Sequence, residues 1–145
     1  MKNDKYIVYL ISRTKQKMTK FINHQLKSHS IEGLIPSHGN ILTTLYESND
    51  ELSMKEIANT IGKDKSTVTG LINKLVSLGY IKKEKSVKDN RVILIKLTKS
   101  GLDLEEKFNY ISSQVYETAY KNFSEEEKTI FLNLLKKLNQ NFTDF

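Results

Sequence analysis

The sequence predicts a mainly α-helical chain with one small β-hairpin, an α+β fold. Apolar residues recur at helical spacing over most of the 145 residues. Two short segments between residues 80 and 97 have the β-branched content of strands. The chain has no cysteine, and its length allows one domain to fold without a disulfide or a structural metal.

A long amphipathic helix is expected over residues 6–26. Its apolar positions recur every three or four residues: Ile7, Leu10, Ile11, Met18, Phe21, Ile22 and Leu26. Residues 28–35 are expected to form a loop, and Pro36 suits the first turn of a second helix that continues to about Glu47. The polar residues 48–50 end this pattern.

A helix–turn–helix is expected next. Ser53 and Glu56 have the spacing of a capping box, in which each side chain binds the other residue's free backbone N–H. Gly62 can adopt the left-handed conformation that ends this helix, and Asp64 is a candidate N-cap for the following one. The second helix then buries apolar residues at helical spacing: Val68, Leu71, Ile72, Leu75 and Leu78.

The remaining elements are a hairpin and two helices. Residues 80–85 and 91–97 are expected to pair as strands across the polar loop 86–90, which makes the helix–turn–helix a winged one. Thr98 can cap a helix over residues 99–122, and Ser124 with Glu127 forms a second capping box for the last helix. Apolar stripes on the first helix and the last two, with Phe142 and Phe145 at the end, predict a homodimer, although these helices could instead pack only within one subunit.

The positive charge is confined to one third of the chain. Residues 54–99 hold eleven basic and four acidic residues, whereas the chain as a whole has a formal net charge of +6. Such asymmetry indicates a polyanionic partner, either nucleic acid or an anionic membrane surface, although a solvated lysine-rich face would look the same. The basic segment contains no basic helix with a wide apolar face, so a membrane role is the weakest of these interpretations.

The second helix of the motif has the chemistry of a DNA-reading helix. The side opposite its apolar residues presents small polar groups at Ser66, Thr69, Gly70, Asn73 and Ser77, with Lys65, Thr67 and Lys74 beside them. Such a surface fits the major groove, where asparagine can pair with adenine through two hydrogen bonds and hydroxyls can bond bases or phosphates. The candidate contacts on this helix are Lys65, Ser66, Thr67, Thr69, Asn73 and Lys74.

The hairpin is the second candidate reader. Lys88 and Arg91 lie at its tip, and a guanidinium there suits a narrow, electronegative minor groove. Asp89 is expected to orient Arg91, although the two residues could simply pair across the turn.

Five stretches form a recognisable set: LSMKEIA (52–58), STVTGLINKL (66–75), LGYI (78–81), DNR (89–91) and LTKSG (97–101). As a set they resemble the MarR family of bacterial winged helix–turn–helix transcription regulators, over the whole chain. The resemblance implies a winged helix–turn–helix over residues 36–99, flanked by dimerisation helices at 1–30 and 100–145. It also implies a homodimer that binds double-stranded DNA at a palindromic operator, usually to repress.

The resemblance also implies a small aromatic or amphipathic effector that releases the DNA. Family pockets lie between the dimer helices and the winged domain, so Tyr9, Arg13 and Tyr46 are candidate lining residues, or else ordinary interface and core residues. One departure matters, because many members carry arginine where this chain has Gly70. The sequence preference of the family therefore does not carry over directly.

No enzyme motif or cofactor site is found, so the chain is not expected to be an enzyme. His24, His29 and His38 could come together, but they lack the His-x-x-x-His spacing of a metal site. Glu32 and Glu47 are possible carboxylate ligands that nothing in the sequence singles out. A metal-responsive regulator of the same fold and a winged-helix module for an acidic protein remain alternatives. With no signal peptide or spanning segment in the sequence, the expected location is the cytoplasm.

Overall fold

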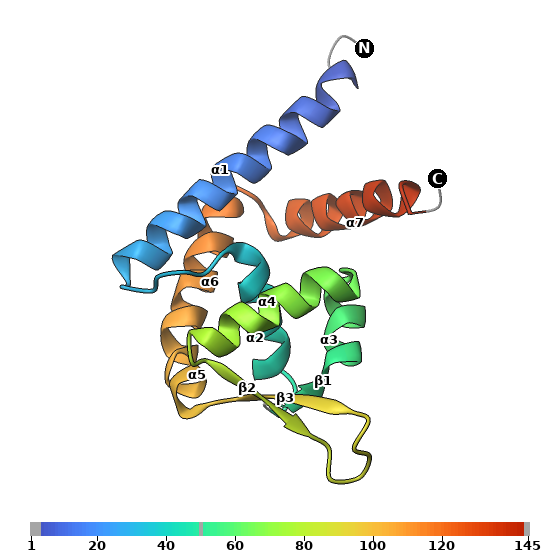
Figure 1. Cartoon of the computed structure of the whole chain (residues 1–145). Coiled ribbons are helices and arrows are strands. Elements are labelled where there is room, and N and C mark those ends of the chain that lie inside the picture. Colours follow the sequence, from blue (N-terminus) through green and yellow to red (C-terminus); the bar gives the residue numbers. More distant parts are fainter. Residues whose placement is uncertain (1–3, 50, 144–145) are drawn as a thin grey trace. The chain divides into compact units, whose positions relative to one another are not determined.

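A computed structural model describes residues 4–49 and 51–143, which form mainly helices and one small antiparallel sheet (Figure 1). The predicted mainly α fold with a β wing is confirmed. In chain order the elements are η1 (Asp4–Tyr6), α1 (Ile7–Ser28), α2 (Pro36–Tyr46), β1 (Glu51–Ser53), α3 (Met54–Ile61), α4 (Lys65–Ser77), β2 (Ile81–Lys85), β3 (Ile93–Leu97), α5 (Lys99–Asp103), α6 (Glu105–Ala119) and α7 (Glu125–Asn141).

The chain divides into two compact units, and the boundary falls inside α6, after Ile111. The first unit holds the core, in which α2, α3 and α4 pack with the sheet. The most deeply buried side chains come from all four of these parts: Ile41, Leu42, Leu45, Ile57, Val68, Ile72, Leu75, Ile81 and Ile95. Removing these apolar side chains from water is the main force that holds the helix–turn–helix together.

The helix–turn–helix has the caps that its sequence predicts. Ser53 and Glu56 exchange hydrogen bonds of 2.7 and 3.1 Å at the start of α3. Gly62 ends α3 at φ +66°, a left-handed conformation that glycine adopts without strain. Asp64 then caps α4 by accepting a 2.7 Å hydrogen bond from the backbone N–H of Thr67. These contacts fix where α4 begins and so which of its residues face outward.

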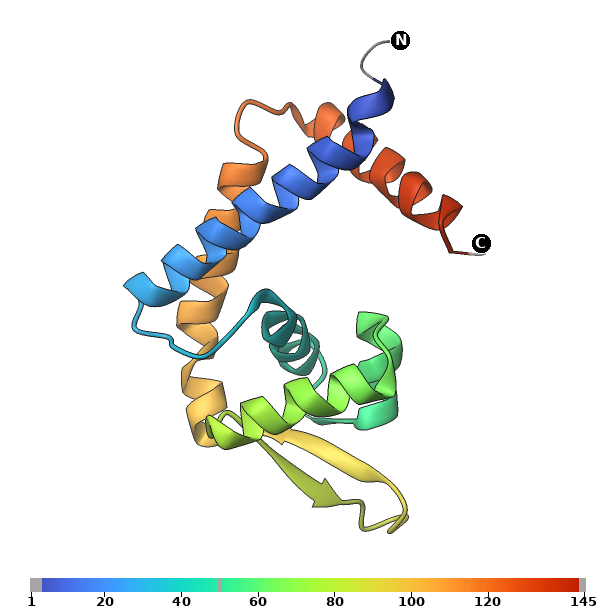
Figure 2. The ribbon, with the colours of Figure 1, turned by 45° about the horizontal axis from the view of Figure 1, so that its top comes forward.

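The sheet has three strands where only a hairpin was expected. Its order is β1-β3-β2, and β1 pairs with β3 through Leu52 opposite Ile95. The prediction missed β1 because three residues carry no periodicity of their own, and the strand exists only because β3 offers an open edge. The β2–β3 hairpin extends past α3 and α4 as a wing (Figure 2).

The helix expected over residues 99–122 is bent and shorter. Thr98 caps it as predicted, by accepting from the N–H of Gly101 at 3.1 Å. The helix then divides at Leu104 into α5 and α6, although Leu104 keeps helical angles and the backbone hydrogen bonds continue across it. The helix ends at Ala119, three residues early, and Asn122 beyond it has a left-handed φ of +66°. Left-handed residues commonly follow helix ends.

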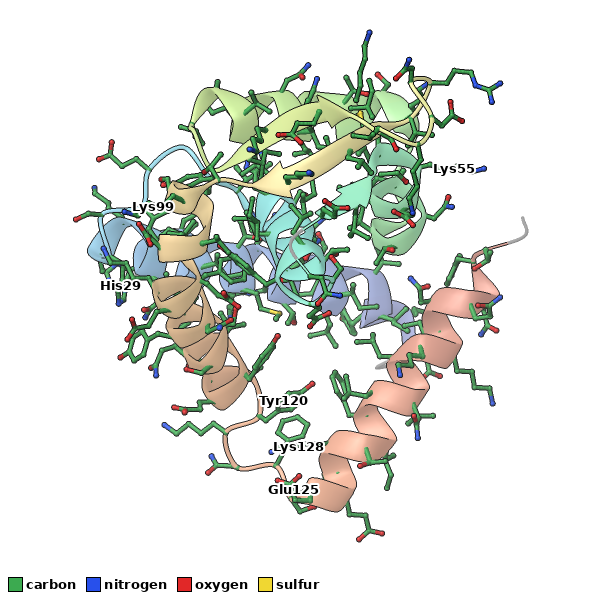
Figure 3. The ribbon with its side chains drawn as sticks, turned by 90° about the horizontal axis from the view of Figure 1, so that it is seen from below. His29, Lys55, Lys99, Tyr120, Glu125 and Lys128 are labelled. Atoms are coloured by element: carbon green, nitrogen blue, oxygen red, sulfur yellow. The ribbon has the colours of Figure 1, made fainter. Side chains whose placement is uncertain are left out.

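The second unit contains the end of α6, a turn and α7. Ser124 and Glu127 form the predicted capping box at the start of α7. Lys128 binds Glu125 at 2.8 Å and lies over the ring of Tyr120, as Figure 3 shows. Rings of Phe123 and Phe131 continue this cluster, and together they fix the turn between the two helices. Phe145, expected to add apolar surface at the end, lies outside the described residues.

No helix in the described part of the chain is both long and apolar enough to cross a membrane.

Among the glycines, Gly101 has the least room for a side chain. A Cβ added there would lie 2.1 Å from the carbonyl oxygen of Tyr80, so Gly101→Ala must push two backbone segments apart. We expect it to lower the free energy of unfolding by about 1–3 kcal/mol, measured by urea denaturation. Gly70→Ala is the matched control. An added Cβ meets nothing within 4 Å at that helical position, so it should raise stability by about 0.5–1 kcal/mol. Equal effects of the two changes would contradict this interpretation of Gly101.

Candidate nucleic-acid interface

The outward side of α4 is the centre of the candidate interface. Its apolar residues Val68, Ile72 and Leu75 are buried, which turns the opposite side to solvent. Five of the six predicted contact residues on this helix are exposed: Lys65, Ser66, Thr67, Asn73 and Lys74. Thr69 is half-buried, and its hydroxyl donates a 2.8 Å hydrogen bond to the carbonyl of Lys65. The hydroxyl oxygen of Thr69 therefore has only acceptor capacity left for a partner.

The carboxylate of Asp64, just before α4, is hydrogen-bonded to the first turn of that helix. Hydrogen bonds from Thr67 keep the pKa of the Asp64 carboxyl below its ordinary value. The negative charge is spread over backbone N–H groups that carry the positive end of the helix dipole. Asp64 can thus sit beside a polyanion-binding surface as a structural cap.

The wing tip holds Arg91 and Asp89 together. The carboxylate of Asp89 accepts from Nε of Arg91 at 3.1 Å and from Nη2 at 3.3 Å, and also from the Arg91 backbone N–H at 3.0 Å. These bonds lower the pKa of Asp89. The Arg91 side chain is still 91% exposed, so the pair leaves much of the guanidinium available to a partner. Lys88 is also exposed in the same loop.

A cavity of about 650 Å³ lies between α3, the start of α4 and the wing. Its cations come from all three parts: Lys55, Lys63, Lys65 and Arg91. Figure 3 shows Lys55 projecting outward from α3. Lys65 at the start of α4 and Arg91 of the wing therefore line the same cavity. The sequence analysis did not assign Lys55 and Lys63 to the site, although both belong to the basic segment that it identified.

The two faces of the sheet differ in charge. Lys82, Glu84, Lys96 and Glu51 lie on the face turned away from the core, where Lys96 binds Glu84 at 2.9 Å and Glu51 at 3.3 Å. Lys82 also binds Glu84, at 3.0 Å. These contacts raise the pKa of Lys96 and lower that of Glu84. The carboxylates thereby neutralise Lys82 and Lys96, two cations of the basic segment 54–99. The excess positive charge of that segment is left on the side of the sheet that faces α4 and at the wing tip.

Asn73, predicted to read bases, is in contact with the wing. Its Oδ1 accepts a 2.5 Å hydrogen bond from Nζ of Lys83 on β2. The sequence indicated no such pair, because the two residues are ten positions apart and meet only through the packing of β2 beside α4.

Comparison with known proteins shows which proteins this chain resembles. A model of the MarR family matches residues 32–91, which contain the helix–turn–helix and most of the wing. The transcriptional repressor YetL of Bacillus subtilis is 29% identical over 130 residues, which cover 88% of this chain and 78% of YetL.

Two solved structures have the same fold. The organohalide-sensing regulator RdhR-CbdbA1625, solved with 2,4-dichlorophenol, has a TM-score of 0.84 at 22% identity, over 96% of this chain and 80% of that one. A mutant of MarR from E. coli, solved with operator DNA, has a TM-score of 0.78 at 22% identity, over 94% and 96% of the two chains.

Residues 32–91 thus match the MarR family, and the relatives that resemble most of the chain are transcriptional regulators. This family is one of regulators rather than enzymes, as the sequence analysis expected.

The three candidate effector-pocket residues lie in two different settings. Tyr9 and Arg13 contact each other on α1, through a hydrogen bond to the tyrosine hydroxyl and a ring contact. Tyr46 is half-buried on α2, where its hydroxyl donates a 2.7 Å hydrogen bond to the carbonyl of Gly101 and its ring meets Phe108. The 650 Å³ cavity is lined by none of the three. Tyr46 thus has a packing role between α2, α5 and α6.

Two of the three histidines make contacts at helix ends. His38 is buried, and its Nδ1 accepts a 2.9 Å hydrogen bond from the N–H of Ile35 at the start of α2. His29 contacts the carbonyl of Gln25 and the ring of Tyr110, whereas His24 is exposed. Residues 4–49 and 51–143 contain no group of three or more histidines and carboxylates that could hold a metal ion.

His38 should make stability depend on pH. Burial, and then the charge of Lys74, lower the pKa of His38 below its ordinary value of 6.5. The unfolded chain binds this proton more readily than the folded one, so the stabilisation is complete above about pH 6.5 and falls as the pH drops further. His38→Gln keeps a side-chain acceptor and removes the titration.

We expect the free energy of unfolding of the wild type to fall more than that of His38→Gln between about pH 7.5 and pH 5. Urea denaturation across this range measures the difference, and the exposed His24→Gln is the control. Parallel curves for the wild type and His38→Gln would exclude His38 as the cause.

Proposed function

We propose that this chain is a MarR-family regulator that binds double-stranded DNA sequence-specifically, with α4 in the major groove and the wing in the adjacent minor groove. The observation that carries the proposal is that the polar side of α4 and the Arg91 side chain at the wing tip are both exposed. Lys65 at the start of α4 and Arg91 also line one cavity, together with Lys55 and Lys63. A helix of this kind fits a groove about 12 Å wide, and an exposed guanidinium suits the narrower one. The E. coli MarR structure with operator DNA supports the proposal by its likeness in fold.

The DNA contacts in this proposal are Lys65, Ser66, Thr67, Thr69, Asn73, Lys74, Lys88 and Arg91, with Asp89 orienting Arg91. The winged helix–turn–helix spans residues 36–99, and the flanking segments 1–30 and 100–145 supply the dimer helices.

The acting form is a homodimer on a palindromic operator. Within the first unit, η1 and the start of α1 expose a run of apolar side chains: Tyr6, Ile7, Val8, Tyr9, Leu10 and Ile11. Within the second unit, α7 exposes Ile130, Phe131, Leu132, Leu134 and Leu135. Contiguous apolar surface on this scale marks an interaction surface. Two identical winged domains would then meet half-sites about one helical turn apart.

Repression is the expected outcome, because a dimer seated on a promoter excludes the polymerase, and YetL is a repressor. A small aromatic or amphipathic effector would release the DNA by favouring a dimer whose reading helices are wrongly spaced. The likeness to a regulator solved with 2,4-dichlorophenol supports this step. A protein with this role would act in the cytoplasm, with the chromosome.

Fluorescence anisotropy tests DNA binding directly. The purified chain is titrated onto its own upstream intergenic DNA and onto random duplex of equal length, across a salt series. We expect tight, selective binding to the upstream DNA, with affinity that falls steeply as salt rises because bound phosphates release counterions. Equal weak binding to both would overturn the proposal and favour an acidic protein as the partner of the basic surface.

Arg91→Ala should weaken binding to the upstream DNA by roughly tenfold, because the wing loses its exposed guanidinium. Anisotropy at one salt concentration measures the loss. Lys99→Ala removes the same charge from the start of α5, away from the wing tip, and should have a smaller effect. An Arg91→Ala variant that binds like the wild type would remove the wing from the mechanism.

Val8→Lys should weaken the dimer. Val8 is 77% exposed on α1, and placing a charge in an apolar interface should raise the dimer dissociation constant about tenfold or more. Sedimentation equilibrium measures the change. Val87→Lys is the matched control, because that valine is fully exposed at the wing and should leave the dimer intact. If the two variants dimerise equally well, α1 is not part of the interface.

A further inference from the structure

Lys83 lies on the core-facing side of the wing. In the sheet it stands opposite Ile95, which is fully buried, whereas its neighbours Lys82 and Glu84 lie on the other face. Successive strand residues point to opposite faces, so the Lys83 side chain must leave the sheet on the side where α4 packs. It reaches the outward side of α4 and ends at Asn73.

The contact fixes the orientation of the Asn73 amide. A lysine ammonium has only donors, so the atom that it meets at 2.5 Å must be the carbonyl oxygen of Asn73. The NH₂ group is then turned the other way, away from Lys83. A free asparagine could present its oxygen and its NH₂ together to adenine, but here the oxygen is engaged.

We infer that Lys83 is a specificity-determining residue, which makes Asn73 a hydrogen-bond donor and directs the pair to guanine. The inference rests on the proposed function. Lys83 occupies one of the two acceptor positions of Asn73 Oδ1, and the pair presents donors beside it, from the amide NH₂ and the remaining ammonium hydrogens. In the major groove guanine presents two adjacent acceptors, O6 and N7, which match two adjacent donors. Adenine presents N7 beside an amino donor, cytosine presents an amino donor, and thymine presents a single acceptor beside a methyl group.

The surface around the pair is open to a base edge. Gly70 lies three residues before Asn73, so the two share one side of α4. A Cβ at Gly70 would meet nothing within 4 Å, and no side chain covers this part of the helix surface from that position. The lack of a side chain there lets a base approach the amide of Asn73 closely.

The test is selection from a random duplex library, followed by anisotropy on the selected site and its single-base variants. The variants are Lys83→Met, which removes the ammonium, Lys83→Arg, which keeps a donor, and Asn73→Ala. Lys85→Met is the matched control, because Lys85 lies two residues along the same face of β2 and carries the same charge.

The wild type is expected to select guanine at a position in each half-site, and to bind the adenine variant about tenfold more weakly. Lys83→Met should lose most of this preference because the freed amide can turn toward adenine, and Lys83→Arg should keep it. Asn73→Ala should abolish discrimination at that position. Lys85→Met should weaken binding to all sites equally and reduce the salt dependence.

An unchanged guanine-to-adenine ratio in Lys83→Met, or wild-type sites without a guanine, would overturn the inference while DNA binding itself stands. If the wild type selects no sequence at all, the proposed function has failed instead. The contact can be checked without DNA, because Lys83→Met should shift the side-chain NH₂ resonances of Asn73 in a ¹H–¹⁵N spectrum, and Lys85→Met should not. Unmoved resonances in Lys83→Met would also overturn the inference.

Discussion

The geometry of the winged domain depends on one close crossing of the backbone, where Gly101 lies against the carbonyl of Tyr80. The same carbonyl accepts a 3.1 Å hydrogen bond from the N–H of Thr98, whose hydroxyl donates to Gly79 at 2.5 Å. The crossing therefore joins the end of α4 and the start of β2 to the end of β3 and the start of α5. Both wing strands are held at their base in this way. Strand alternation alone then decides which of their side chains point toward α4 and which point away from it.

That alternation separates two kinds of lysine. Lys82 and Lys96 point to the outer face, where Glu84 and Glu51 neutralise them. Lys83 points to the helix side, where it binds the neutral amide of Asn73. Exposed ion pairs of this sort add little stability, so their main effect is on the electrostatic field. The positive potential is directed toward α4 and the wing tip, which is where the proposed DNA would lie.

Local chemistry made much of this fold predictable. Ser53, Gly62 and Asp64 act through neighbours within four residues, so the sequence alone indicates the start and end of α3 and the start of α4. The strand β1 and the contact between Lys83 and Asn73 were not predictable in this way, because each needs a partner that only the folded chain brings near. In the candidate site, the residue types were thus readable from the sequence, but their partners and the half-burial of Thr69 were not.

The pair of Lys83 and Asn73 matters more because α4 has glycine, not a long side chain, at position 70. Resemblance to the MarR family predicts an arginine at Gly70, and such a side chain would reach from α4 without help from the wing. Here α4 has no long side chain at that position, and the nearest amide is oriented by a lysine of β2. In the proposed complex with DNA, the helix and the wing are therefore not independent readers. Any change that moves β2 relative to α4 also changes which hydrogen-bonding groups α4 offers to a base, so wing position and base preference are coupled through a single hydrogen bond.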